Sequence, residues 1–298
     1  MLKKVKLGRT GLLVTQLGFG AMELRGPKVW SGRPVADEQA ERVLNAVLDA
    51  GINFIDTSVD YGLSEERIGK FISSRRKEFY LATKCGCDPR EVGDKWETPH
   101  TWTADNILRN IEGSLKRMKT DYVDVLQFHN PKPDDVAREK LVEVLQDIQR
   151  RGLAKFIGIS STLPDLPVYA EMGVFDTFQI PYSVLEPKHH DAISLAARTG
   201  AGTIIRGGIA KGGPESDVAA SRVDAWKKAA LEELLEGMTP AEMILRATLT
   251  HPDCHTTIIG TLNIEHIQAN VAAAAKGPLP AKLYEELRRR IAQAGGKP

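Results

Sequence analysis

Short apolar runs of strand length recur along the whole chain and alternate with segments long enough to form helices. We expect eight strands, at Leu17–Ala21, Asn53–Asp56, Phe79–Thr83, Val123–Phe128, Phe156–Ile159, Thr177–Ile180, Thr203–Ile205 and Thr256–Ile259. The expected helices include Asp37–Ala50, Thr103–Met118, Asp134–Arg151, Pro187–Thr199, Pro240–Thr250 and Ile264–Ala275. Because each strand is followed by a helix-sized connection, the pattern predicts a parallel sheet closed into a (β/α)8 TIM barrel.

The ends of the chain extend this repeat. Gly8 and Gly11 interrupt apolar alternations between Lys3 and Gln16, which predicts an N-terminal β-hairpin over residues 1–16. We expect this hairpin to close the bottom of the barrel, away from the active site. A length of 298 residues suits one domain over residues 1–298, with a C-terminal tail and helix in residues 276–298.

A doubly wound dinucleotide fold is the competing α/β architecture. Its glycine-rich turn, Gly-x-Gly-x-x-Gly, opens a helix directly after the first strand. Here the corresponding stretch, Gly18 to Glu23, contains two glycines and then runs into a loop with Pro27. The barrel is therefore the favoured architecture.

Composition excludes several partners and compartments. Lys plus Arg (40) nearly equals Asp plus Glu (39), so we expect no nucleic-acid partner. No stretch approaches the roughly 18 apolar residues of a membrane span, and we expect a cytoplasmic protein without a membrane partner. An odd number of cysteines, at positions 85, 87 and 254, fits a reducing compartment. Neither Cys85-x-Cys87 nor the His189-His190 and His251 to His255 stretches show zinc-ligand spacing, so we expect no metal.

Four ionisable residues lie at or just past the ends of three consecutive predicted strands: Asp56, Tyr61, Lys84 and His129. A tyrosine titrates near pH 10, and an adjacent Lys84 would lower the pKa of Tyr61 and stabilise its phenolate. Asp56 would hold the lysine, and His129 could polarise a carbonyl oxygen. Such a set protonates an oxygen while a hydride, for example from a nicotinamide, attacks the carbon.

Each of these residues also has a commoner structural role. Asp56 could end a strand or cap a helix, Tyr61 could lie in the core beside a turn, and Lys84 could form an ordinary ion pair. His129, before Asn130 and Pro131, could be a loop histidine. Their placement at neighbouring strand ends favours the joint catalytic role.

The chain resembles the aldo-keto reductase superfamily over nearly its whole length. The motifs that carry the resemblance are Gly18-Phe-Gly-Ala-Met22, Asn53-Phe-Ile-Asp-Thr57, Asp60-Tyr-Gly62, Ala82-Thr-Lys84, Asp121-Tyr-Val-Asp-Val-Leu-Gln-Phe-His129 and Phe156-Ile-Gly-Ile-Ser160. The resemblance implies a (β/α)8 barrel that binds NADP(H) or NAD(H) along its carboxyl rim. It also implies Tyr61 as general acid/base, Lys84 and Asp56 as the pair that tunes it, and His129 as the residue that orients a carbonyl substrate.

The resemblance further implies a set of cofactor contacts, in which Ser160 and Gln179 hold the carboxamide of the nicotinamide. Ser161 replaces the usual asparagine, and Arg206 stands where many members stack a tyrosine. Lys211 is either a phosphate ligand or a solvated lysine. The full set is Gly20, Met22, Asp56, Ser160, Ser161, Gln179, Arg206, Gly207, Ile209, Lys211, Gly260, Thr261, His266 and Asn270.

The segment expected to meet the 2'-phosphate of NADP departs from the family pattern. His266 stands in the place of an arginine, while Thr261 and the helix start could bind phosphate and Asn270 could meet the adenine. We expect NADP(H) over NAD(H), with both cofactors possible.

Aromatic residues in the rim loops are candidates for a substrate pocket. Trp30 and Trp96 could wall a pocket for a small carbonyl or alcohol, or could pack the loops. Packing is favoured for Trp102, and Tyr182 lies on the rim of the sixth strand. Cys85 and Cys87 are expected to be small buried side chains near the site.

Three functions remain open: an NAD(P)H-dependent oxidoreductase that interconverts a carbonyl and an alcohol, a cofactor-binding regulatory subunit and a lyase. The second resembles the potassium-channel β subunits, and the intact set of four residues argues against it. In the third, Lys84 forms a Schiff base with substrate. The sequence gives neither the oligomeric state nor the identity of the substrate.

Overall fold

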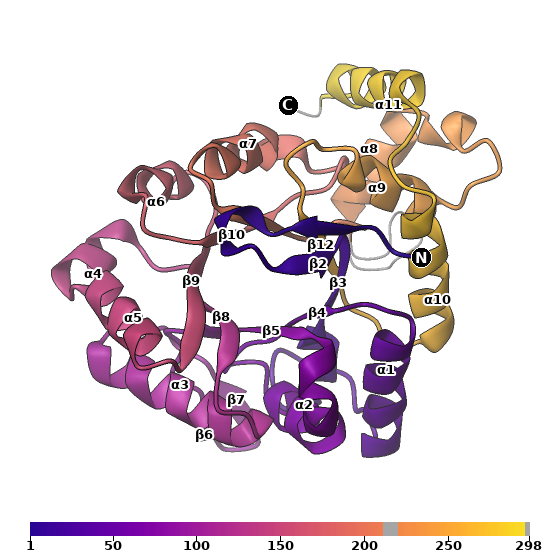
Figure 1. Ribbon diagram of the computed structural model, residues 1–298. Coiled ribbons are helices and arrows are strands. Elements are labelled where there is room, and N and C mark those ends of the chain that lie inside the picture. Colours follow the sequence, from indigo (N-terminus) through magenta and orange to yellow (C-terminus); the bar gives the residue numbers. More distant parts are fainter. Residues whose placement is uncertain (211–219, 296–298) are drawn as a thin grey trace.

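Eight parallel strands close into a barrel in the computed structural model, which describes residues 1–210 and 220–295 (Figure 1). Around the barrel the order is β10, β11, β12, β3, β4, β5, β8 and β9. The strands are β3 (Leu17–Gly20), β4 (Phe54–Asp56), β5 (Tyr80–Cys85), β8 (Val123–His129), β9 (Ala154–Ser160), β10 (Thr177–Pro181), β11 (Gly202–Arg206) and β12 (Thr256–Ile259). All eight predicted strands and the predicted (β/α)8 barrel are confirmed.

Helices surround the barrel (Figure 1). They are α1 (Asp37–Asp49), α2 (Ser64–Phe71), α3 (Ala104–Met118), α4 (Pro133–Arg138), α5 (Leu141–Arg150), α6 (Leu166–Met172), α7 (His190–Arg198), α8 (Ala220–Lys228), α9 (Pro240–Leu249), α10 (Ile264–Ala275) and α11 (Ala281–Gln293). In α1, Ala40, Val43 and Val47 recur at helical spacing and are buried, so this helix covers the sheet with one apolar face. The C-terminal helix expected in residues 276–298 is α11.

The predicted helix Asp134–Arg151 was wrong as a single element. It is divided into α4 and α5, because Lys140 between them adopts a left-handed conformation with φ of 50°. After this break Leu141, Leu145 and Ile148 are buried on one face of α5. Lysine is a good helix former, so nothing at position 140 of the sequence indicated the interruption.

The predicted N-terminal hairpin is present as β1 (Lys4–Lys6) and β2 (Leu13–Thr15), joined through a 3-10 helix at Gly8–Thr10. Figure 1 shows it lying across one opening of the barrel. Leu7 and Val14 are fully buried against apolar residues of the barrel strands, including Phe54. Asn53 Oδ1 accepts a hydrogen bond of 2.7 Å from the backbone N–H of Thr15, at the start of β4. The hairpin therefore closes the amino-terminal end of the barrel, as expected.

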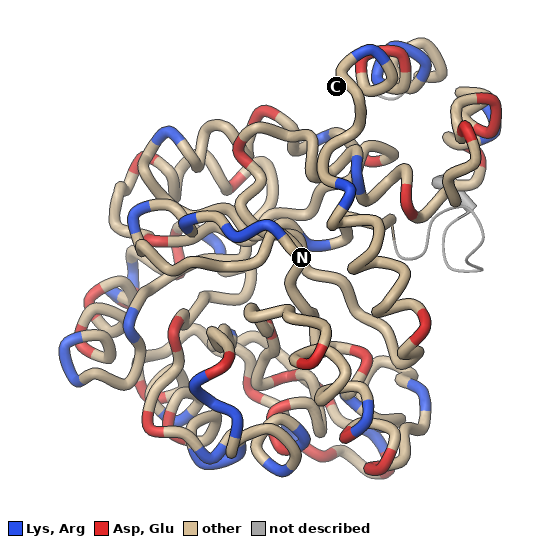
Figure 2. The backbone as a smooth tube through the Cα atoms, turned by 45° about the vertical axis from the view of Figure 1, so that its right-hand side comes forward, with Lys and Arg blue, Asp and Glu red and all other residues tan. Residues whose placement is uncertain are grey.

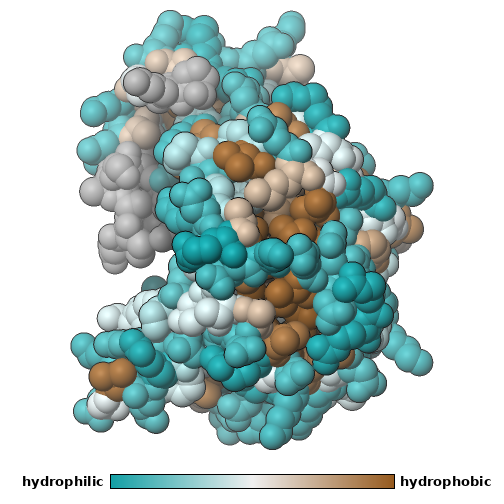
Figure 3. Space-filling view, turned by 90° about the vertical axis from the view of Figure 1, so that its left-hand side faces the viewer, coloured by the Kyte–Doolittle hydropathy of each residue, from teal (hydrophilic) through white to brown (hydrophobic). Residues whose placement is uncertain are grey.

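The outer surface is mixed in charge and mainly hydrophilic. Basic and acidic residues are interspersed around the backbone in Figure 2. Figure 3, which faces the side where α4 and α6 lie, shows hydrophobic side chains gathered in a band between hydrophilic ones. None of the helices within the described ranges is both long and apolar enough to cross a membrane.

Candidate active site

Alternation along the strands places a polar layer directly above the apolar floor of the barrel. The floor comprises Phe54, Ala82, Val125, Ile204 and Ile258, with Leu7 and Val14 of the hairpin below them. Successive side chains of a strand point to opposite faces, so residues two positions further along the strand share the interior face. On β4, β5 and β8 these residues are Asp56, Lys84 and Gln127, and all three are buried. The sequence pattern thus places polar groups in the interior, one layer above the apolar floor.

Lys84 lies at the centre of this polar layer, with no part of its side chain exposed. Its ammonium Nζ lies 2.6 Å from Asp56 Oδ2, 2.8 Å from the carbonyl oxygen of Thr57 and 3.4 Å from Tyr61 Oη. A lysine ammonium has three donors, and these three oxygens match them in number. Three of the four predicted catalytic residues are therefore in direct contact.

The second carboxylate oxygen of Asp56 is held by two amides. Gln127 Nε2 donates to Oδ1 at 3.0 Å and Gln179 Nε2 donates to it at 2.8 Å. We expected no role for Gln127 from the sequence, although its position two residues before His129 on β8 indicated the same interior face. Gln179 was expected to hold a cofactor amide; one N–H of its amide bonds Asp56, which leaves its oxygen and its second N–H for that purpose.

The titration of Tyr61 differs from the expectation drawn from the sequence. Burial raises the pKa of the Tyr61 phenol, and this effect exceeds the opposing influence of Lys84, while Asp56 and Asp60 add to the rise. Burial alone would lower the pKa of Lys84, but Asp56 and Tyr61 raise it overall. The site therefore contains a protonated phenol beside a charged ammonium.

His129 ends β8 and lies beside the tyrosine. The two rings are 6.1 Å apart between centroids and nearly perpendicular, at 81°. His129 Nδ1 lies 3.3 Å from Asp60 Oδ1, which also accepts a hydrogen bond from the Ser58 hydroxyl. Burial would raise the pKa of Asp60, but the bonds from His129 and Ser58 outweigh it and lower that pKa to about 2. Asp60 is therefore an anion that fixes the ring of His129, a role that the sequence analysis did not assign.

Ser160 provides a buried polar atom without a partner next to His129. It is the last residue of β9 and pairs with His129 across the sheet. The Ser160 hydroxyl has no hydrogen-bond partner among the described residues, although it is shielded from solvent. A buried hydroxyl left in this way is a feature that a ligand can satisfy. Ser161 follows it, also buried, with its backbone N–H donating to Gln179 O at 3.1 Å.

Arg206 ends β11, two strands from β9 around the barrel. Burial lowers the pKa of its guanidinium, while Tyr61 and Asp56 raise it. The positive charge of Arg206 therefore interacts with these two groups. Gly207 follows with a φ of 76°, in the left-handed region that glycine tolerates. Ile209 is half-buried against the main core. Lys211 lies outside the described residues.

The loop after β12 places the remaining predicted cofactor residues at the start of α10. The Thr261 hydroxyl lies 3.4 Å from His266 Nδ1. His266 is exposed on the first turns of α10, and Asn270 is buried one turn further on. A Cβ atom on Gly260 would come within 2.9 Å of the carbonyl oxygen of Gly20, so these two rim positions adjoin. Met22 follows Gly20 on a 3-10 helix (Ala21–Arg25) and is 37% exposed.

Comparison with known proteins agrees with this architecture. The model of the aldo/keto reductase family matches residues 16–291. The chain belongs to this family. It is 28% identical over 291 residues to L-galactose dehydrogenase of Arabidopsis thaliana, covering 91% of this chain and 87% of that protein. It is 26% identical over 293 residues to the uncharacterized oxidoreductase YqkF of Bacillus subtilis (strain 168), covering 92% and 91%.

A solved structure extends the comparison to three dimensions. The holo form of the aldo-keto reductase AKR11C1 from Bacillus halodurans has a TM-score of 0.84 and 29% identity, covering 97% of this chain and 96% of that one. The family and these relatives support an enzyme that oxidises alcohols or reduces carbonyls of small molecules.

Two of the aromatic residues predicted at the rim of this aldo/keto reductase have different surroundings. Trp30 is 45% exposed, and its ring lies edge-on to Tyr61 at 5.9 Å between centroids. Trp96 belongs to a small hairpin, β6 (Arg90–Val92) and β7 (Lys95–Glu97), that the sequence did not predict. Its backbone N–H donates to Lys28 O at 3.2 Å, in the loop that carries Trp30. Trp30 therefore lies beside the proposed acid, and Trp96 supports its loop.

The other two aromatic residues pack within the fold. Trp102 lies edge-on to Phe128 at 5.7 Å between ring centroids, consistent with the packing role expected for it. Tyr182 is buried, and its ring lies 5.7 Å from those of both His190 and His251. None of these ring contacts of Trp102 and Tyr182 involves Tyr61.

Proposed function

We propose that this aldo/keto reductase interconverts an aldehyde or ketone and an alcohol with NADP(H) or NAD(H), using Tyr61 as the general acid/base. The observation that carries the proposal is the fully buried ammonium of Lys84, which contacts Tyr61 Oη and Asp56 Oδ2 at once. A phenol is a weak acid unless the charge that it acquires is stabilised. Lys84 supplies that stabilisation within 3.4 Å.

In the reductive direction, Tyr61 donates its phenolic proton to the carbonyl oxygen. Lys84 stabilises the phenolate, and Asp56 keeps Lys84 charged and in place through the 2.6 Å contact. His129, fixed by Asp60, orients the carbonyl oxygen from the side facing Tyr61. The nicotinamide, when bound, supplies or accepts the hydride at the substrate carbon. The reverse reaction uses Tyr61 as the base.

The buried Ser160 hydroxyl supports nicotinamide binding. The carboxamide of the nicotinamide would supply the hydrogen-bond partner that this hydroxyl lacks among the described residues. We assign Ser160, Ser161 and the oxygen of Gln179 to that amide, and Arg206 to the face of the ring. The backbone at Gly20, Met22, Gly207 and Ile209 lines the path of the cofactor, with Gly260, Thr261, His266 and Asn270 at its adenosine end. Trp30 borders the substrate space.

The direct test is fluorescence titration of the purified protein with NADPH and NADH, followed by oxidation of the bound form with a panel of carbonyls. Because one relative is named L-galactose dehydrogenase, aldoses with NADP⁺ and NAD⁺ belong in the panel. Saturable binding with substrate-dependent turnover supports the proposal. Binding without turnover would instead favour a regulatory subunit, and absence of binding would refute the cofactor assignment.

Replacing His266 with arginine is expected to tighten NADPH relative to NADH. His266 is exposed on the first turns of α10, where arginine could form a bidentate pair with the 2'-phosphate. The ratio of the two dissociation constants should shift roughly tenfold toward NADPH, as one charge-assisted pair allows. Ala137→Arg, at an exposed position of α4 on the side of the barrel away from α10 (Figure 1), is the control. An unchanged ratio in His266→Arg would refute the placement of the 2'-phosphate.

The Schiff-base lyase is disfavoured by the surroundings of Lys84. A nucleophilic amine must be neutral, but Asp56 and Tyr61 raise the pKa of Lys84, and three oxygens hold its ammonium. Borohydride trapping of a carbonyl substrate on Lys84 would contradict this conclusion.

A further inference from the structure

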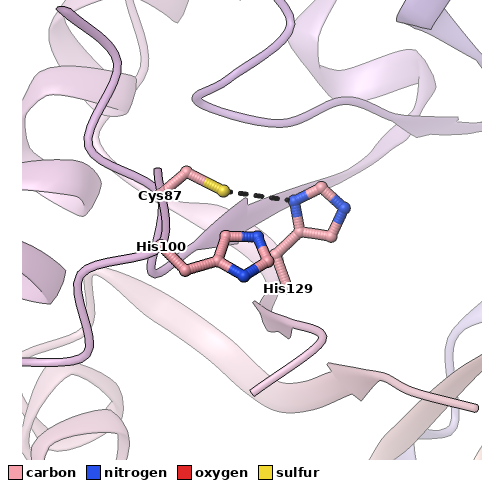
Figure 4. Close-up of side chains that lie close together, drawn as sticks. All are labelled: Cys87, His100 and His129. Atoms are coloured by element: carbon pink, nitrogen blue, oxygen red, sulfur yellow. Dashed lines mark hydrogen bonds between the residues drawn. The ribbon is translucent and has the colours of Figure 1, made fainter. Parts of the chain in front are cut away.

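Three side chains that commonly bind metals meet at the rim of the barrel (Figure 4). Cys87 follows β5, His100 lies in the loop before α3, and His129 ends β8. One ligand atom from each lies within 4.8 Å of the other two. Cys87 Sγ and His129 Nδ1 are 3.4 Å apart and point toward each other.

We propose that Cys87, His100 and His129 bind one soft divalent cation of the Zn²⁺ class, and that the bound ion inhibits the reductase. The inhibition rests on the proposed role of His129, since an ion on its Nδ1 replaces the Asp60 contact that fixes the ring for the carbonyl. The binding of the ion does not depend on that role.

The donor set is suited to such an ion. Zn²⁺ binds thiolate sulfur at about 2.3 Å and imidazole nitrogen at about 2.0 Å in a tetrahedron, which puts neighbouring ligand atoms roughly 3.5 Å apart. The distance between Cys87 Sγ and His129 Nδ1 already matches this spacing. Three protein ligands leave a fourth position open to water or substrate, and the exposed ring of His100 gives the ion a route from solvent.

The backbone holds two of the ligands in place before any ion binds. Cys87 and His100 face each other in an antiparallel bridge. On either side of it, the N–H of Asp88 donates to Pro99 O and the N–H of Thr101 donates to Gly86 O, both at 2.8 Å. A preformed pair loses less conformational entropy on binding.

The electrostatic surroundings also favour a cation. The Asp60 carboxylate lies 3.3 Å from His129 Nδ1, so a negative charge adjoins the cluster. Metal binding replaces the S–H bond of Cys87 with a metal–sulfur bond and releases the thiol proton to solvent, without oxidation, with the ring proton of His129 on Nε2.

We expected no metal from the sequence, and these three ligands show no recognisable spacing there, since they come from the segment after β5, the loop before α3 and the end of β8. The decisive experiment titrates metal-stripped, full-length protein with Co²⁺, followed by competition with Zn²⁺. We expect one equivalent to bind, with a near-ultraviolet thiolate-to-cobalt charge-transfer band. Cys87→Ser should abolish that band, whereas Cys254→Ser, at another buried free cysteine, should retain it. His100→Asn should weaken Zn²⁺ by at least about tenfold, since even indirect partners of a metal contribute on that order.

Measurements of metal binding and of carbonyl reduction distinguish a failure of the metal site from a failure of the proposed function. Tyr61→Phe should bind Co²⁺ like the wild type, and Zn²⁺ should inhibit carbonyl reduction by the wild type but not by His100→Asn. A charge-transfer band in a protein without reductase activity would leave the metal site intact and refute the proposed function. Absence of stoichiometric binding, or a band that survives Cys87→Ser, would overturn the metal site.

Discussion

Replacing Tyr61 with phenylalanine is expected to abolish carbonyl-dependent oxidation of NADPH while leaving NADPH affinity nearly unchanged. The substitution removes only the hydroxyl that lies 3.4 Å from Lys84 Nζ and keeps the ring that contacts Trp30 and His129. Loss of a general acid costs on the order of 100- to 10,000-fold in rate. The fall should appear in kcat and in kcat/KM alike, because the proton transfer occurs only in the transition state.

The matched control for this prediction is Tyr122→Phe. Tyr122 lies before β8, at the opposite end of the strand from His129, and its ring contacts Arg76 and Lys155 through its face. Phenylalanine keeps these cation–π contacts, so this variant should retain wild-type turnover. Steady-state kinetics and NADPH fluorescence titration measure both effects. Wild-type turnover in Tyr61→Phe would refute the assignment of Tyr61.

Replacing Lys84 with methionine is expected to destabilise the protein by about 3–5 kcal/mol and to abolish turnover. The variant leaves the Asp56 carboxylate buried without its cation, and removal of one partner of a buried ion pair typically costs this much. Adding Asp56→Asn to the same variant should recover part of the lost stability, because no buried charge then remains. Urea denaturation measures the free energy of unfolding of each variant.

The exposed Lys70–Asp37 pair is the control for this experiment, because it tests whether burial or the distance between the charges decides how much an ion pair contributes to stability. Its Nζ–Oδ2 distance of 2.6 Å equals that of Lys84 and Asp56, but the two side chains are 54% and 44% exposed. Solvent screens such a pair, so Lys70→Met should have no resolvable effect on unfolding. Equal losses in the Lys70 and Lys84 variants would contradict the argument that burial makes the pair at the active site critical.

Lys84 also shows how much of the proposed site could be predicted from the sequence. Its place at the end of an apolar run, next to the runs ending at Asp56 and His129, predicted that the three groups would meet, and β4, β5 and β8 are neighbours in the barrel. The sequence could not give the titration of Tyr61. That depends on the balance between burial and the charge of Lys84, and burial is a property of the assembled barrel.

The eight strands, the parallel barrel and the hairpin beneath it follow from the sequence itself, because side-chain alternation and helix-length spacing are local properties of the chain. The tertiary structure alone decided the contacts between segments that are distant in the sequence. It placed the Gln127 and Gln179 amides on Asp56, Asp60 on His129, and Cys87 beside His129. These contacts arise because closing the barrel brings the carboxyl ends of separate strands to one rim, and no local pattern encodes which side chains meet there.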